Sequence, residues 1–312
     1  MIVVCGEALF DVFCDGETAA GYALSARSGG SPFNLAVGLA RLGAPAMFFG
    51  GLSHDLFGRK LAAALADEGV DVTAAPRPAA ATALVTVDVD AGGAPTYTLY
   101  GNATAERQVA AADLARVPAD AAAIHVGSYC MAVEPVASTL LALVRRQQGR
   151  SLIAFDPNVR LTIQPDRDVW RAAIAAMLPL TDLLKISDED IGLVYPDTTP
   201  EQFVATALDA GVALVVVTRG AHGVLAATRA SGTHALPAQR VDVVDTVGAG
   251  DTFQAALLSH LVRQQLFTRA ALAALEPAQL LAALLFAGRA AAITCARRGA
   301  DMPTLQEVPP QE

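Results

Sequence analysis

The sequence predicts an α/β fold in which helices flank a central, mostly parallel sheet. Short apolar segments rich in β-branched residues alternate with longer amphipathic segments, as in βαβ units. One short segment, residues 213–218, is apolar throughout, which is typical of a strand buried on both faces. Residues 82–90 and 96–100 instead alternate in polarity on either side of a turn at residues 91–95. They predict an antiparallel pair that projects from the main sheet.

The composition is that of a soluble globular protein. The 312 residues are 53% hydrophobic and 17% charged, which suits one large domain or one domain with an appendage. The net charge of -9 argues against a general nucleic-acid-binding surface. The four cysteines are scattered without a CxxC pair, so we expect reduced cysteines and neither a zinc site nor a disulfide framework.

Targeting and membrane segments are not predicted. Residues 1–7 have no basic leader and include an early acid, unlike a signal peptide. The longest apolar run, residues 280–296, is alanine-rich, contains Arg289 and is too short and too weakly apolar to prefer a bilayer to a core. We therefore expect a cytoplasmic location and no membrane partner.

The first elements along the chain are a strand and a helix. Residues 2–5 show a buried-strand pattern, and residues 6–13 continue it. Ser31 is suited to the N-cap of the next helix, with Pro32 at its first position and Gly43 at its end.

The remaining elements keep the same alternation, apart from a hairpin-like return at residues 222–228. Residues 309–312 are expected to be disordered. Further strands are expected at residues 46–52, 122–126, 152–155, 183–186 and 213–218. Further helices are expected at residues 55–68, 133–148, 170–178, 201–210, 252–265 and 277–295.

Polar or glycine-rich stretches follow successive strands of this pattern. Ligands of open α/β sheets bind at the carboxyl ends of the strands, so we expect these stretches to meet on one rim. The stretches are residues 156–160, 185–190, 218–223 and 245–253.

The last of these stretches has the most distinctive chemistry. A β-branched run stops at Asp245, and Gly248, Ala249 and Gly250 then precede Asp251 and an apolar helical pattern. Glycine-rich turns at helix N-termini can aim backbone N–H groups at an anion. Asp251 would repel that anion, so it needs a role of its own. A general base beside a developing phosphate charge is one interpretation, and a helix N-cap beside an ordinary turn is the other.

A second group of candidates lies near the N-terminus. Asp11 follows an apolar run, where an acid either binds a hydroxyl group or caps a turn. Gly29 and Gly30 would let the backbone approach a ligand closely. Asn34 lies in the first turn of the predicted helix, where its helix propensity is poor, so it either faces a ligand or lies exposed.

Two of these stretches resemble the signature motifs of ribokinase-like (PfkB-type) carbohydrate kinases. They are GGSPFNLA at residues 29–36 and DTVGAGDTF at residues 245–253. The similarity spans essentially the whole chain, with the intermediate motifs in order. Within the family, the sequence is most similar to bacterial fructokinases, on the evidence of residues 6–11, 156–160 and 293–300.

This resemblance implies an architecture and an activity. The α/β core would comprise residues 1–11, 28–80 and 106–312, with a small β-sheet lid from residues 12–27 and 81–105. The activity would be ATP-dependent phosphorylation of a sugar hydroxymethyl group, with fructose giving fructose 6-phosphate. The lid is expected to close over the substrate and exclude water. Its exposed strand edges could also pair two subunits into a homodimer.

The resemblance assigns catalytic and substrate-binding roles. Asp251 matches the general base, and the amides of Gly248, Ala249 and Gly250 match the anion hole that stabilises the transferring phosphate. The residues that match substrate-binding positions are Asp11, Gly30, Asn34, Tyr97 and Arg160. The alternative for Arg160 is a surface salt bridge, and the alternative for Tyr97 is ordinary strand packing.

The resemblance also implies an ATP site. The matching positions on the phosphate side are Lys185, Thr218, Gly220, Gly223, Gly248 and Gly250. Adenine would lie against Ala287 and Ala291 on the last helix, where Gly288 replaces an asparagine common in the family.

Two cation sites are expected beside ATP. The family commonly has Asn-x-x-Glu near Mg²⁺, and here Ser187 and Asp190 take these positions, so Asp190 would act through a water. A K⁺ site could involve Asp245 and nearby backbone carbonyl groups.

The sugar is less firmly indicated than the reaction. Fructokinases often carry an arginine directly after the tyrosine that matches Tyr100, and this chain has Gly101 there. A 2-keto-3-deoxygluconate kinase is the alternative, with Arg160 or Arg107 facing the substrate carboxylate. A non-catalytic sugar or nucleotide sensor would be expected to lack the base or the anion hole. A dinucleotide oxidoreductase would need an early GxGxxG, which is absent.

Overall fold

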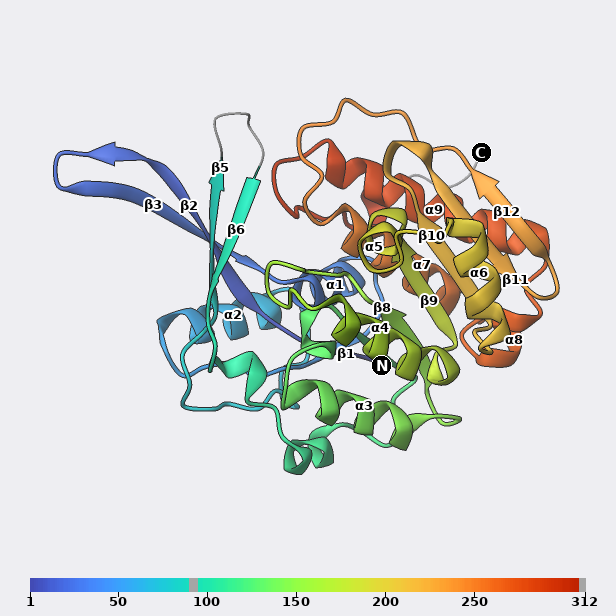
Figure 1. Cartoon of the computed structure of the whole chain (residues 1–312), viewed down its shortest axis with the longest axis horizontal. Helices are drawn as coiled ribbons and strands as arrows, with labels where there is room; N and C mark the ends of the chain where they lie inside the picture. The colour runs from blue at the N-terminus through green and yellow to red at the C-terminus, as the bar shows by residue number, and fades with distance from the viewer. Residues whose placement is uncertain (90–94, 309–312) are drawn as a thin grey trace.

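The computed structural model describes residues 1–89 and 95–308. The expected turn at residues 91–95 falls mostly outside these ranges, as does the expected disorder at residues 309–312. Within the described residues, an eight-stranded sheet and a separate four-stranded sheet make up the β structure (Figure 1). The predicted α/β class is therefore confirmed.

The eight-stranded sheet is parallel except at one edge. Strands β10, β9, β8, β7, β1 and β4 pair in parallel, each with the next, whereas β10–β11 and β11–β12 are antiparallel. In spatial order the strands are β12 (Gly232–Leu236), β11 (Val224–Thr228), β10 (Leu214–Thr218), β9 (Leu183–Ser187), β8 (Leu152–Asp156), β7 (Ala123–Gly127), β1 (Ile2–Cys5) and β4 (Ala46–Phe49).

Helices cover both faces of this sheet, so its central strands are buried on both sides. In β1, Val3 and Cys5 belong to one hydrophobic core, and Ile2 and Val4 belong to the other. The first core is covered by α3 (Val136–Gln147), α4 (Arg167–Met177), α5 (Asp188–Val194) and α6 (Pro200–Asp209). The second is covered by α1 (Ser31–Arg41), α2 (Leu56–Asp67), α7 (Ala249–Arg263), α8 (Arg269–Ala273) and α9 (Pro277–Cys295).

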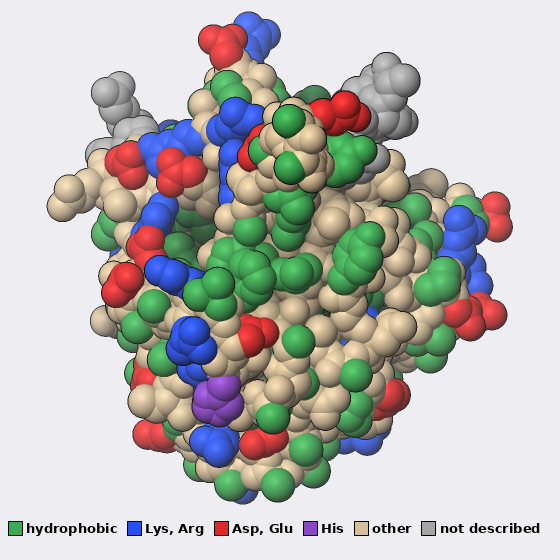
Figure 2. Space-filling view, turned by 90° about the vertical axis from the view of Figure 1, so that its left-hand side faces the viewer, with side chains coloured by type: hydrophobic (Ala, Val, Ile, Leu, Met, Phe, Trp, Pro, Cys, Tyr) green, Lys and Arg blue, Asp and Glu red, His purple; other side chains and the backbone are tan. Residues whose placement is uncertain are grey.

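The four-stranded sheet, hereafter the second sheet, has the order β3-β2-β5-β6 and projects from one side of the main sheet (Figure 1). Its strands are β2 (Leu9–Thr18), β3 (Gly21–Gly29), β5 (Leu84–Val89) and β6 (Pro95–Tyr100). The antiparallel β5–β6 pair confirms the sequence prediction. Figure 2 views the molecule from the side on which this sheet projects, and hydrophobic side chains gather near the middle of that face. Exposed hydrophobic side chains on its strands include Tyr22, Leu24 and Tyr100.

Several boundaries differ from the sequence-based expectation. Residues 6–13 do not continue β1, because the chain leaves the main sheet after Cys5 and Leu9 begins a strand of the second sheet. The expected N-cap at Ser31 is wrong: Gly30 occupies the cap of α1 and Ser31 is its first helical residue. Three short elements were not anticipated, namely α5, α8 and β12.

The helix α9 is long and apolar enough to cross a membrane by length and composition alone, with a mean hydropathy of 1.6 over its most apolar window. This is weak evidence, since core helices of soluble proteins pass the same test. Here Leu280, Leu284 and Ala287 are buried in the second core, and the helix packs against α7. We therefore interpret α9 as a core helix of a soluble fold.

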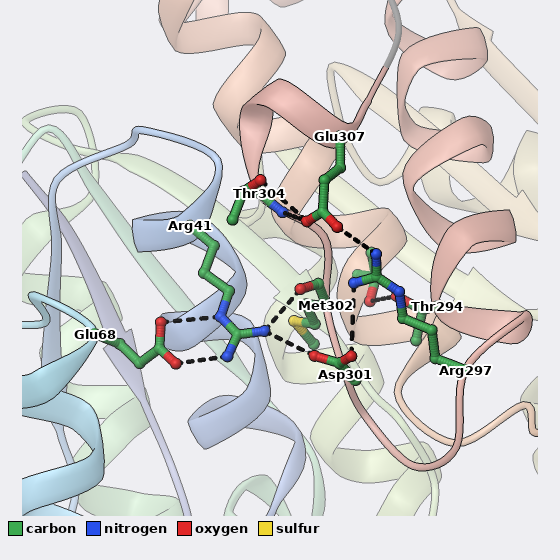
Figure 3. Close-up of polar contacts among 9 residues, drawn as sticks. Arg41, Glu68, Thr294, Arg297, Asp301, Met302, Thr304 and Glu307 are labelled. Atoms are coloured by element: carbon green, nitrogen blue, oxygen red, sulfur yellow. Dashed lines mark hydrogen bonds and ion pairs between the residues drawn. The ribbon is translucent and has the colours of Figure 1, made fainter.

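The C-terminal segment is held against α1 by a polar network (Figure 3). The Arg41 guanidinium donates to both carboxylate oxygens of Glu68, at 2.9 and 2.6 Å, and to Asp301 and the Met302 carbonyl, at 3.0 and 2.7 Å. The Met302 side chain is itself buried against α1, because a Cβ added at Gly38 would lie 2.5 Å from its sulfur. This network fixes the C-terminal end of α1.

Candidate active site

The N-terminus of α7 is formed by a turn that only glycine can occupy. Gly248 caps the helix in the left-handed region, at φ 77°. A Cβ added there would lie 2.5 Å from the Cβ of Ala300 and 2.9 Å from its Cα. Asp245 fixes the surrounding loops, because it accepts from the Val247 amide at 3.0 Å and from the Gly299 amide at 2.8 Å.

Asp251 lies in the first turn of α7 and is not its N-cap, so that interpretation of the sequence is wrong. The Ser31 hydroxyl donates to its Oδ1 at 2.6 Å, and the Asn34 amide donates to its Oδ2 at 2.9 Å. The N-termini of α1 and α7 therefore meet at one carboxylate.

A buried ion pair lies beneath this turn. Lys185 on β9 donates from Nζ to Asp156 Oδ2 on β8 at 2.7 Å, and both side chains are buried. Burial alone would lower the pKa of Lys185, but the carboxylates of Asp156, Asp251 and Asp190 raise it overall. A Cβ added at Gly250 would lie 3.1 Å from Lys185 Nζ. The ammonium group therefore lies directly beside the glycine turn.

The backbone amides of the turn are not equivalent. The Ala249 amide donates to the Thr246 carbonyl at 3.2 Å, as part of the turn itself. An anion at this turn would therefore rely on the amides of Gly248 and Gly250 and on the Lys185 ammonium more than on Ala249.

Asp190, the residue expected to act on Mg²⁺ through a water, lies at the start of α5. It is buried, and its Oδ1 accepts from the Val159 amide at 3.0 Å. Ser187, the residue expected beside it, accepts from the Asp190 amide at 2.9 Å and caps α5. Residues 1–89 and 95–308 contain no group of three or more His, Cys, Asp or Glu side chains suited to a metal. A Mg²⁺ ion here would therefore need oxygens from the substrate and from water, which is the usual mode for Mg²⁺ bound to phosphates.

On the side of the second sheet, Asp11, Arg160 and Tyr97 lie within electrostatic reach of one another. Burial raises the pKa of Asp11 to about 6, and the positive charge of Arg160 opposes this rise. Burial, followed by the charges of Asp11 and Asp245, raises the pKa of Tyr97. A Cβ added at Gly29 would lie 2.3 Å from Asp11 Oδ2, so the glycine gives this carboxylate its space.

The backbone at Gly30 packs closely against Glu7. A Cβ added at Gly30 would lie 2.9 Å from the Glu7 carbonyl oxygen and 3.3 Å from its Cγ. The Glu7 side chain is buried, and burial raises its pKa to about 7 against the hydrogen bond of Ser128. The segment at residues 28–30 therefore lies tightly on the end of β1.

The residues expected on the nucleotide side lie along β10, β11 and α9. Thr218 is half-buried at the end of β10, and Gly220 is exposed in the following turn. Gly223 has a packing reason of its own, because a Cβ there would lie 2.0 Å from the Leu236 carbonyl oxygen. On α9, Ala287 is fully buried and Ala291 is half-buried.

A surface pocket of about 500 Å³ lies beside α9. The segment at residues 239–241 lines one side of it, and Ala292, Ile293 and Ala296 line the other. A Cβ added at Gly288 would lie 3.9 Å from Gln239 Cγ, so the loop passes over the position where an asparagine was expected. The roles proposed for the nucleotide-side residues remain predictions.

The structure thus brings Asp251, Asn34 and Lys185 together, and it places Asp11 with Arg160 and Tyr97. Sequence analysis missed the contacts of Ser31, Asp156 and Glu7. Ser31 had a usable signal, since it lies three residues before Asn34 and therefore on the same side of the helix. For Asp156 and Glu7, the sequence carried no signal of these contacts beyond their positions at strand ends.

Comparison with known proteins places the chain in a family. A model described as pfkB family carbohydrate kinase matches residues 1–307. A fructokinase of Rhizobium leguminosarum bv. trifolii is 35% identical over 279 residues, covering 88% of this chain and 84% of that protein. A fructokinase of Klebsiella pneumoniae is 37% identical, with 83% of this chain and 84% of that protein covered.

Solved structures agree with this match. The fructokinase of Xylella fastidiosa with bound ATP superposes with a TM-score of 0.89 at 29% identity, covering 98% of this chain and 96% of that one. The fructokinase of Vibrio cholerae O395 with fructose, ADP and calcium gives 0.80 at 29% identity, with 99% and 96% covered. The aminoimidazole riboside kinase of Salmonella enterica gives 0.80 at 26% identity, with the same coverage.

Proposed function

This chain belongs to the pfkB family of carbohydrate kinases, and from that premise we propose that it is an ATP-dependent fructokinase that converts fructose to fructose 6-phosphate. The observation that carries the proposal is the position of Asp251, held by Asn34 and Ser31 and close to Lys185. The fructokinases among its relatives, which match most of its length, support fructose as the sugar.

In the proposed reaction, Asp251 takes the proton of the sugar 6-hydroxyl as its oxygen attacks the γ-phosphorus of ATP. The bond from that phosphorus to the bridging oxygen breaks, and ADP leaves with the electron pair. The glycine turn and the Lys185 ammonium stabilise the negative charge that develops on the transferring group. Mg²⁺, when bound with the phosphates, would neutralise part of their charge, with Asp190 reaching it through a water. A K⁺ ion near Asp245 remains part of the proposal; a potassium-bound fructokinase of Vibrio cholerae is among the structures similar to this one.

The sugar would lie between the main sheet and the second sheet. Asp11, Gly30 and Asn34 supply both acceptors and donors for its hydroxyl groups. Arg160 and Tyr97 complete this side of the site. We propose that the second sheet acts as a lid that closes on the sugar and excludes water, which limits ATP hydrolysis.

Two arginines, Arg107 and Arg160, were expected as partners for the carboxylate of 2-keto-3-deoxygluconate. Arg107 is engaged by its own neighbours, since its Nε lies 3.6 Å from Glu106 and its guanidinium lies over the Tyr129 ring at 5.9 Å. Arg160 is thus the residue left to face a substrate carboxylate, and its charge already acts on Asp11. The acid sugar remains the second candidate, because the exposed Arg160 could serve it.

The proposal also covers where the enzyme acts and how its subunits associate. We propose that the enzyme acts in the cytoplasm, and that two subunits associate through their second sheets. The exposed Tyr22 and Leu24 on β3, and Tyr100 on β6 at the opposite edge of the sheet, support this association, because exposed large apolar side chains favour burial against a partner.

A sugar-panel assay tests the function. The purified protein is incubated with ATP and Mg²⁺, and ADP release is followed with fructose, 2-keto-3-deoxygluconate, an aldonate and a ribonucleoside. We expect the highest kcat/KM with fructose, and a product that phosphoglucose isomerase converts to glucose 6-phosphate. If none of these compounds stimulates ADP release, the proposal is wrong. Preference for the keto acid would select the second candidate.

A further inference from the structure

We infer that Ser31 positions the general base, a role that rests on the function proposed above. Ser31 is the first residue of α1, but its hydroxyl does not cap the helix. It instead donates to Asp251 Oδ1 at 2.6 Å, across a sequence separation of 220 residues. This is a short bond to a charged acceptor, of the kind that fixes the orientation of a carboxylate.

The two hydrogen bonds to Asp251 have different consequences. Ser31 holds Oδ1, whereas Asn34 holds Oδ2 at 2.9 Å. A sugar hydroxyl must donate to one of these oxygens before it loses its proton. Asn34 is also proposed to bind the sugar, so its amide can turn to the substrate and leave Oδ2 to the incoming hydroxyl. Ser31 therefore determines which oxygen acts as the base.

The Ser31 bond can persist through the proton transfer. When the proton moves from the sugar to Oδ2, Oδ1 becomes the carbonyl oxygen of the carboxylic acid. A carbonyl oxygen still accepts from a hydroxyl, so Ser31 needs no rearrangement.

Other charges around Asp251 come from the main sheet. Lys185 on β9 and Asp156 on β8 both interact electrostatically with Asp251, and these two are paired with each other at 2.7 Å. The first turn of α1 carries no acidic residue. Removal of the Ser31 hydroxyl therefore leaves these charges in place and takes away one hydrogen bond from the base.

The test compares S31A, S31T and D251N with the unmodified enzyme in the sugar-stimulated ATP assay. We expect S31A to lower kcat about tenfold, since a hydrogen bond to a charged group contributes on this scale. Its KM for the sugar should change less than about twofold, because Ser31 is not proposed to touch the sugar. S31T, which keeps the hydroxyl, should restore most of the lost kcat.

A matched control is S138A. Ser138 also lies in the first turn of a helix, α3, and donates to a carboxylate, Glu134, at 2.8 Å, but on the exposed surface. We expect no change in kcat for this variant. A loss of kcat in S31A without recovery in S31T, or with an equally large rise in KM for the sugar, would contradict a positioning role. So would an S31A enzyme with unchanged kcat while D251N is inactive. Near-normal turnover by D251N would instead refute the proposed base, and with it the function proposed for this site.

Discussion

The Lys185 ammonium and the Asp156 carboxylate form a buried ion pair, with 2.7 Å between Nζ and Oδ2, under the glycine turn of α7. Removal of one partner leaves the other as a buried, unpaired charge. We therefore expect K185M to destabilise the fold by about 3 kcal/mol. We also expect kcat to fall about 100-fold, because the cation beside the developing phosphate charge is lost.

The double variant K185M/D156L separates these two effects. It removes both charges, so most of the lost stability should return, as measured by thermal unfolding. The low kcat should remain, because no cation has been restored beside Gly250. A double variant with normal kcat would show that Lys185 serves only the fold.

Substitution by alanine should affect the stability of the fold differently at the two glycines of the turn. Gly248 has φ 77° and faces the backbone of Ala300, so G248A should cost about 2 kcal/mol or more and reduce kcat strongly. Gly250 lies within α7, and an added Cβ would meet only the end of the Lys185 side chain, 3.1 Å from Nζ. G250A should keep the thermal stability, helped by the higher helix propensity of alanine. Its kcat should still fall, because the methyl group displaces the ammonium.

Thermal unfolding and kcat are measured on both variants in parallel. A larger loss of stability in G250A than in G248A would contradict this account of the turn.

The sequence predicted correctly those features of the fold that depend on neighbouring residues in the chain. The glycines and the apolar pattern around Asp251 predict the turn and α7, because backbone conformation and helix periodicity depend on nearby residues. The antiparallel pair of the second sheet is visible for the same reason. Local patterns do not show which strand a segment pairs with. Leu9 is as apolar as the residues of β1, so its transfer to the second sheet could not be foreseen.

The missed parts of the site depend on tertiary contacts. Ser31 looks like a helix cap in sequence, and only folding places its hydroxyl against Asp251. The helix α5 was hidden because its first turn, with Asp188, Glu189 and Asp190, reads as a polar strand end. The short β12 has mostly exposed or half-buried residues, so it lacks the buried-strand pattern.

The raised pKa of Asp11, about 6, predicts a pH dependence of sugar binding. Above this pH the carboxylate is ionised and accepts hydrogen bonds from sugar hydroxyls. As the pH falls through about 6, protonation removes acceptor capacity, so KM for the sugar should rise. We expect a rise of about tenfold between pH 7.5 and pH 5, on the scale of one hydrogen bond to a charged group.

The variant D11N is the control for this dependence. It should show a high KM at every pH, without the rise toward acid. A D11N enzyme that keeps the pH dependence of KM would assign it to another group.

The polar network at the C-terminal end of α1 predicts a stability effect remote from the chemistry. Arg41 joins α1 to Glu68 and to the segment at Asp301 and Met302. Its bidentate contact with Glu68 is of the stronger kind, so we expect R41A to cost about 2 kcal/mol. For a chain of this size, that loss corresponds to a fall in Tm of about 3 °C.

The effect on activity should be smaller than the effect on stability. Arg41 fixes the C-terminal end of α1, while Ser31 and Asn34 lie toward the other end, about three and about two turns away at about 3.6 residues per turn. We therefore expect R41A to keep kcat within about twofold, because packing of α1 against α7 still holds the N-terminal turn. R145A, which removes an exposed arginine in the last turn of α3, is the matched control and should leave Tm unchanged. Equal Tm values for R41A and R145A would mean that the network contributes nothing to the stability of the native fold. A large loss of kcat in R41A at unchanged Tm would instead show that this end of α1 controls the position of Asn34.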